Sequence, residues 1–124
     1  MADDDPLAAI RLKAGLRAWA KDVDPRQRAA VELLIADGYW LRHDGFAGPH
    51  GAIRHDGNKA WIGWDKARQV ACAGMASSSQ LAILRLAIAI GTDEYRLSRM
   101  DDGQAGNIVA ALATALGMEG MLRG

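Results

Sequence analysis

Three histidines and two aspartates, residue types that bind metals, lie in one short segment of the chain. The sequence Arg-His-Asp-Gly occurs twice, at 42–45 and 54–57, and the third histidine lies between the copies. Imidazole and carboxylate groups are ordinary Zn²⁺ ligands, and three protein ligands plus a water make a catalytic zinc geometry. The candidate ligands are His43, His50 and His55, with Asp44 or Asp56. Such a site would support a metal-dependent hydrolase.

The same segment also suits two tight turns, because Asp-Gly is a preferred centre of a two-residue hairpin loop. The histidine spacings, seven and five residues, match no metal motif with a known mechanism. We therefore expect turns with surface histidines, no bound metal and no cofactor. Ser77–Ser79 stand where a helix needs an N-cap, and Cys72 lies in an apolar stretch without the basic surroundings that activate a thiol. The chain is therefore expected not to be an enzyme.

Length and charge favour a small cytoplasmic domain. We expect residues 1–124 to form a single domain, with 1–4 and 118–124 as frayed tails. The 15 acidic and 15 basic residues cancel, which disfavours wholesale electrostatic binding of nucleic acid or acidic lipid. A single cysteine and a start without signal-peptide character fit a reducing compartment. The longest apolar stretch, 81–90, is too short to span a bilayer, so no membrane contact is expected.

Helix signals dominate both ends of the chain. Asp5-Pro6 and Asp24-Pro25 each combine an N-cap aspartate with proline at the first helical position. They predict helices over 6–21 and 25–37, the second ending at Gly38.

Helical periodicity returns after Trp64. Asp65 is expected to cap a helix that ends near Ala73, and the serines 77–79 a helix over 80–90. The helix over 80–90 is apolar nearly all round and should be the central core helix. A last helix begins at Asp101 or Asp102. Its expected buried stripe is Ile108, Val109, Leu112 and Leu116.

The middle of the chain has the pattern of strands. Short runs rich in aromatic and branched residues, at 39–43, 51–55 and 59–64, are separated by Asp-Gly and Gly-Pro. We predict an α+β fold in which two N-terminal helices, a three-stranded antiparallel meander and three C-terminal helices share one core. A two-residue turn at Asp56-Gly57 would place Ile53 opposite Ala60, whereas a three-residue loop would shift that register.

One face of the predicted meander combines aromatic and basic side chains. These are Trp40, Arg42, Arg54, Lys59 and Trp61. Tryptophan and arginine dominate the binding energy of protein interfaces, and the same set would also stack bases and neutralise phosphates. We expect a non-enzymatic binding or regulatory protein with a protein partner. Nucleic-acid binding through the same face is the alternative, a hydrolase is the second alternative, and a homo-oligomer stays open.

The C-terminal half resembles a group of bacterial and phage proteins. Its serine cluster and Leu-Arg-Leu-Ala helix precede an Asp-Asp step into a last alanine-rich helix. The residues that carry the likeness are Ser77 to Ala87, Leu97-Ser98, Asp101-Asp102, Asn107-Ile108-Val109 and Ala115-Leu116-Gly117. This pattern is similar to that of uncharacterised small proteins of actinobacteria and their phages, and it implies no catalytic residue. Eleven arginines against four lysines also indicate a high-GC bacterium or its phage.

Overall fold

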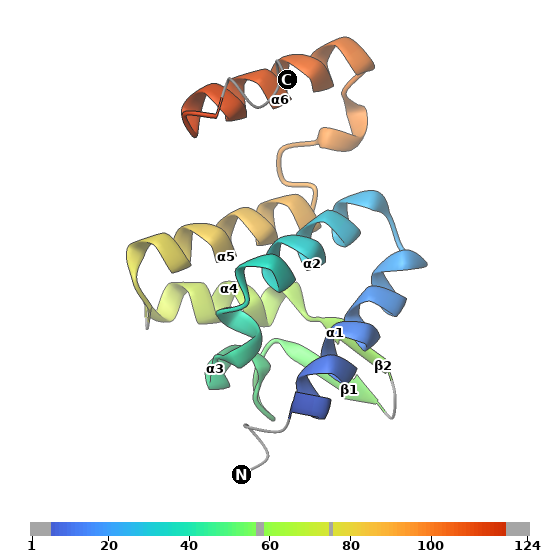
Figure 1. The fold of residues 1–124 in the computed structure, drawn as a ribbon, viewed down its shortest axis with the longest axis vertical. Coiled ribbons are helices and arrows are strands. Elements are labelled where there is room, and N and C mark those ends of the chain that lie inside the picture. The colour runs from blue at the N-terminus through green and yellow to red at the C-terminus, as the bar shows by residue number, and fades with distance from the viewer. Residues whose placement is uncertain (1–5, 57–58, 75, 119–124) are drawn as a thin grey trace.

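The structure, a computed structural model, describes residues 6–56, 59–74 and 76–118. These residues form six α-helices, two 3₁₀ helices and one antiparallel sheet of two strands (Figure 1). The helices are α1 (Pro6–Lys21), α2 (Pro25–Asp37), α3 (Asp44–Ala47), α4 (Trp64–Ala73), α5 (Ser78–Gly91) and α6 (Asp102–Ala115). The strands are β1 (Ile53–Asp56) and β2 (Lys59–Ile62), and the 3₁₀ helices are η2 (Trp40–Arg42) and η3 (Leu97–Arg99). Within the described ranges, every helix is too short or too polar to cross a bilayer.

Capping residues fix most of the helix ends as predicted. The carboxylate of Asp24 accepts hydrogen bonds from the amides of Arg26 and Gln27 at 2.9 and 3.1 Å. Capping boxes begin α5 and α6, where Ser77 and Asp101 are the N-caps. The expected cap Asp5 lies outside the described residues. The expected cap Asp65 is wrong, because Gly63 precedes α4 and no side chain caps it.

The predicted three-stranded meander is wrong, because the segment 39–43 contains the 3₁₀ helix η2 and no strand. Trp40 and Leu41 are both buried. Successive residues of a strand project to opposite faces, so a strand would bury one and expose the other. A helical turn directs both side chains inward. The indole Nε1–H of Trp40 then donates to the carbonyl of Gln80 at 2.9 Å.

The first Asp-Gly pair is also not a hairpin turn. Asp44 and Gly45 begin the single-turn helix α3, whose Phe46 is fully buried. The chain then returns closely over this residue: a Cβ at Gly51 would lie 2.2 Å from the carbonyl oxygen of Phe46. Gly51 therefore allows the loop to pack closely against the backbone of Phe46, whose side chain lies in the core.

The hairpin of β1 and β2 has neither of the registers considered from sequence. Asp56 pairs with Lys59. This pairing is incompatible with the predicted turn centred on Asp56-Gly57. Gly57 and Asn58 lie outside the described residues.

Despite this shift, the two faces of the hairpin are as predicted. Ile53 pairs with Ile62 and not with Ala60, a displacement of two residues. An even displacement leaves each side chain on its original face, whereas a shift of one residue would exchange the faces. Ile53, Ala60 and Ile62 are accordingly buried, and α1 packs on β2.

The core lies between α2, α5, α4 and the inner side of the hairpin. The helices α2 and α5 lie side by side across the middle of the molecule (Figure 1). The largest fully buried side chains are Trp40, Phe46, Leu16, Leu34, Leu84 and Val31. The described residues include no buried polar or charged side chain, so apolar packing is the main source of stability.

Gly91 permits the close contact between α5 and α4. A Cβ at this position would lie 2.4 Å from Cζ2 of Trp64, whose Nε1–H donates to Oε1 of Gln27 at 2.9 Å.

Gly91→Ala should therefore displace the indole of Trp64 and destabilise the protein by about 1–3 kcal/mol, measured by urea unfolding. Gly106→Ala in α6 is the matched control, because its Cβ would meet open space. An unchanged midpoint for Gly91→Ala would contradict this packing.

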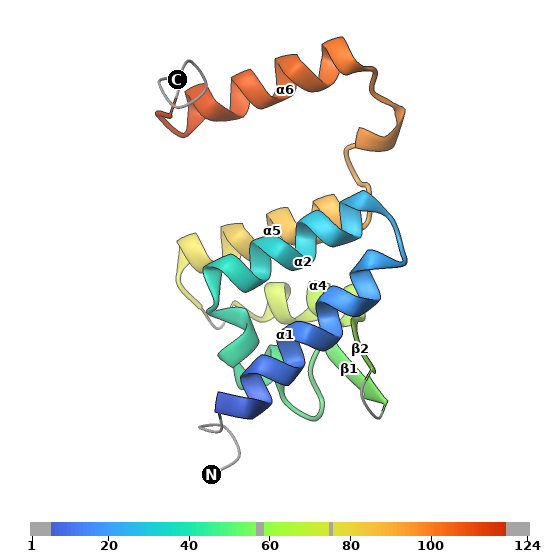
Figure 2. The same ribbon diagram turned by 45° about the vertical axis from the view of Figure 1, so that its right-hand side comes forward.

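The last helix is not part of the core. In both views α6 lies apart from the other helices (Figures 1 and 2), and none of its residues is buried. The predicted buried stripe is therefore wrong: Val109, Leu112 and Leu116 are 52%, 53% and 71% exposed, and Ile108 is only partly buried. Periodicity identified an apolar stripe correctly, but it cannot say whether the same molecule covers that stripe.

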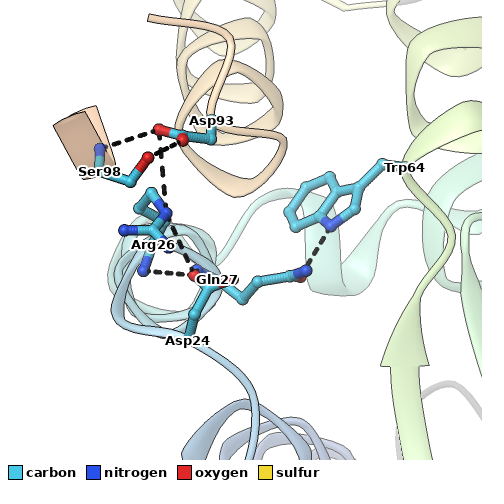
Figure 3. Close-up of polar contacts among 6 residues, drawn as sticks. All are labelled: Asp24, Arg26, Gln27, Trp64, Asp93 and Ser98. Carbon is cyan, nitrogen blue, oxygen red and sulfur yellow. Dashed lines mark hydrogen bonds and ion pairs between the residues drawn. The ribbon is translucent and has the colours of Figure 1, made fainter. Parts of the chain in front are cut away.

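A structured connection, residues 92–101, joins α5 to α6. Asp93 and Arg96 both adopt left-handed backbone conformations, with φ of 56°. The hydroxyl of Ser98 donates to Asp93, and its amide donates to the same carboxylate at 3.3 Å (Figure 3). These bonds, the hydroxyl bond above all, hold the pKa of Asp93 below its ordinary value. Arg26 lies 3.8 Å from Asp93 and ties the connection to the start of α2.

Candidate functional site

The outer side of the hairpin presents an aromatic and charged surface. Opposite residues of an antiparallel pair project to the same side, so the four residues paired as Arg54–Trp61 and Asp56–Lys59 share one face. We call this surface the hairpin face; it comprises Arg54, Asp56, Lys59 and Trp61. The three charged side chains are exposed and the indole is partly exposed.

Trp61 differs from the other three tryptophans of the chain. Trp40 belongs to the hydrophobic cluster, and Trp19 and Trp64 pack against it, whereas Trp61 does neither. The indole of Trp61 is partly exposed and lies outside the hydrophobic cluster. It is therefore available for contact with another molecule.

The hairpin face contains one pair of opposite charges and one further arginine, so it is not a purely basic patch. Lys59 stands across from Asp56, and Arg54 stands across from Trp61. The Nε of Arg54 would lie 3.7 Å from a Cβ at Gly63, so the arginine side chain extends past Trp61 toward the start of α4. The register removes the like-charge pair of Arg54 and Lys59 that a turn at Asp56-Gly57 would have created.

Trp40 and Arg42, the other two predicted binding residues, are not on this face. Both belong to η2, and Trp40 is 1% exposed. Arg42 is exposed and lines an open hollow on the surface at the end of α2. The hollow is bordered by Asp37, Tyr39, Arg42, His43, Asp44 and Gly45. Of the five predicted binding residues, the structure thus brings three together on one face: Arg54, Lys59 and Trp61.

The histidines do not converge. His43 is partly buried, and its Nδ1 is buried without a hydrogen-bond partner, whereas His50 and His55 are exposed. Within residues 6–56, 59–74 and 76–118, no three histidine, cysteine, aspartate or glutamate side chains are placed to hold a metal ion. The described geometry therefore provides no ligand set for the hydrolase chemistry considered from sequence.

A second exposed surface was missed from sequence. It is the stripe of α6 formed by Ile108, Val109, Leu112 and Leu116, which we call the α6 stripe; three of its four residues are more than half exposed. A signal was present: residues 103–118 contain no charged side chain. An apolar helix stripe of this kind is normally buried against another element. The core of this chain does not bury it.

Comparison with known proteins identifies no relative: no protein-family model, curated protein or solved structure matches the chain significantly. The likeness of the C-terminal half to small actinobacterial and phage proteins therefore stays a prediction. Function has to be argued from the surfaces themselves.

Proposed function

We propose that this chain is a non-enzymatic binding protein that contacts a protein partner through the hairpin face. The observation that carries the proposal is the position of Trp61, on a strand pair and outside the hydrophobic cluster. Arg54 stands directly opposite it. Tryptophan and arginine are the residues most enriched among those that dominate protein–protein binding energy.

The charge of the hairpin face favours a protein over a nucleic acid. Phosphate binding draws its affinity from several basic side chains that displace counterions. Here Asp56 accompanies the two basic residues, and the whole chain has equal numbers of acids and bases. Nucleic-acid binding, with bases stacked on Trp61 between Arg54 and Lys59, is the second candidate because the aromatic and basic groups share one face.

Substitutions on the hairpin face test the proposal. The wild type, Trp61→Ala and the exposed control Lys21→Ala would be immobilised separately and used to capture proteins from the lysate of a high-GC actinobacterium. We expect a partner that the wild type and Lys21→Ala retain, and that Trp61→Ala binds about 30-fold more weakly, the loss typical of a dominant interface residue. Circular dichroism would check that Trp61→Ala keeps its fold.

A second measurement separates the two kinds of partner. Fluorescence anisotropy with a labelled single-stranded DNA should show no binding to the wild type at 150 mM salt. Binding of that DNA which weakens steeply with salt and is lost in Trp61→Ala would establish the nucleic-acid function instead. Equal recovery of every captured protein by the wild type and Trp61→Ala would contradict the role of the hairpin face.

A further inference from the structure

Two apolar strips on neighbouring helices are wholly or partly uncovered in this chain. One is the α6 stripe. The other lies on the outer side of α5, where Leu86 is 40% exposed and Ala82 is exposed, while Ile83 and Ile90 border them and pack in part against the core. We call it the α5 strip. Apolar strips of this kind on a helix are normally buried against another element, and exposed apolar patches mark interaction sites.

The connection between the two helices keeps α6 away from the α5 strip of its own chain. Backbone hydrogen bonds from Arg96 to Asp93 and from Arg99 to Arg96, both 3.0 Å, define two successive turns. Asp93 in turn binds Ser98 and lies beside Arg26 (Figure 3). These contacts fix the direction in which the chain leaves α5, and α6 therefore stands apart from the other helices (Figure 2).

We propose that a second copy of this chain covers these strips: α6 of each copy packs on the α5 strip of the other, in a two-fold symmetric dimer. The proposal concerns a surface separate from the hairpin face and does not depend on the function assigned to that face. Exchange of a terminal helix is a low-cost route to a dimer, because one pair of complementary surfaces is used twice.

The charges of the two helices suit this exchange. The only charged residue within α5 is Arg85, which is exposed and takes part in no ion pair among the described residues. The only charged residue within α6 is Asp102, next to its N-cap Asp101. The donated and the receiving helix thus carry one charge each, of opposite sign. Their contact brings no like charges together.

The size of the surfaces favours exchange over a simple pairing of two α6 helices. A stable interface engages about 20–30 residues on each side. Two α6 helices alone would offer one face of a 14-residue helix from each copy. Exchange adds the exposed face of α5, so each copy contributes faces of two helices. Both helices have 14 residues and are therefore about 21 Å long.

The mass of the full chain in solution, by light scattering after size exclusion, tests dimerisation. We expect a mass of twice 13.3 kDa for the wild type. Leu112→Asp should weaken the dimer at least about 30-fold and leave the helical circular dichroism intact, because α6 contributes no buried side chain to the single chain. Thr114→Asp, on the opposite side of α6, is the matched control and should stay dimeric. A monomeric wild type at all concentrations would overturn the proposal.

Disulfide formation between differently tagged chains tests the exchange itself. Both chains would carry Cys72→Ser, which removes the exposed native thiol; one would carry Leu86→Cys and the other Leu112→Cys. We expect a disulfide between the two different chains under mild oxidation. If Leu112→Cys chains link only to each other, the helices pair without exchange and the proposal is wrong. If a single chain with both substitutions closes an internal disulfide as a monomer, α6 folds onto its own α5, which equally refutes it.

Discussion

Leu84→Asp is expected to abolish folding of the protein. Leu84 is fully buried on α5, the helix that packs against both α2 and α4. The described core contains no polar or charged side chain, so a carboxylate there would have neither water nor a partner. Loss of leucine packing alone is worth about 2–5 kcal/mol. With the unpaired buried charge added, the loss approaches the entire stability of a small domain, about 5–15 kcal/mol.

Solubility on expression and thermal unfolding would measure this effect. Leu84→Met keeps the volume and should lose less than about 1.5 kcal/mol. Ser79→Asp places the same charge on the exposed first turn of α5, near its N-terminus, and should change stability by less than about 0.5 kcal/mol. A cooperative wild-type melting curve for Leu84→Asp would show that α5 is peripheral to the core.

Trp40→Ala should produce the second-largest loss of stability. Its indole is 1% exposed and lies edge-on to Tyr39 and Phe46, with ring centroids 5.0 and 5.8 Å away. Removing it creates a large cavity and leaves the carbonyl of Gln80 without its 2.9 Å donor. Truncation of a buried tryptophan destabilises by about 3–5 kcal/mol, which lowers the melting temperature of a domain of this size by more than about 10 °C.

Two control variants separate packing from hydrogen bonding and from partner binding. Trp40→Phe keeps most of the ring but loses the indole donor, so an intermediate melting temperature is expected. Trp61→Ala should melt within about 0.5 kcal/mol of the wild type, because Trp61 does not pack against the core. If Trp40→Ala and Trp61→Ala have equal melting temperatures, the assignment of one indole to the core and the other to the surface is wrong.

These two tryptophans show how far the aromatic and basic face was predictable. Both were assigned to one aromatic and basic face from the sequence pattern. For Trp61 the assignment to the outer face of the hairpin is confirmed, because alternation within a strand fixes which side chains share a side. For Trp40 the assumed strand is a 3₁₀ helix. Trp40 and Leu41 are consecutive apolar residues, and only the surrounding core decides whether both are buried.

Local sequence was enough to predict the structure wherever one side chain satisfies backbone groups directly. Asp24 with Pro25 starts α2, and the box of Ser77 and Gln80 starts α5, because a capping side chain bonds amides within three residues of itself. It also determined which faces of β1 and β2 are apolar. That assignment survived a register error because the error was an even number of residues.

Which apolar surfaces are covered depends on how the elements pack together. Leu84 and Leu112 both lie in the apolar stripe of a helix, yet one is fully buried and the other is 53% exposed. The difference arises from the connection at Asp93 and Ser98, which directs α6 away from the body of the protein. Hydrophobic periodicity reports that a face avoids water. The hydrophobic effect is non-directional, so any apolar surface can bury that face. Local sequence does not specify which surface does so.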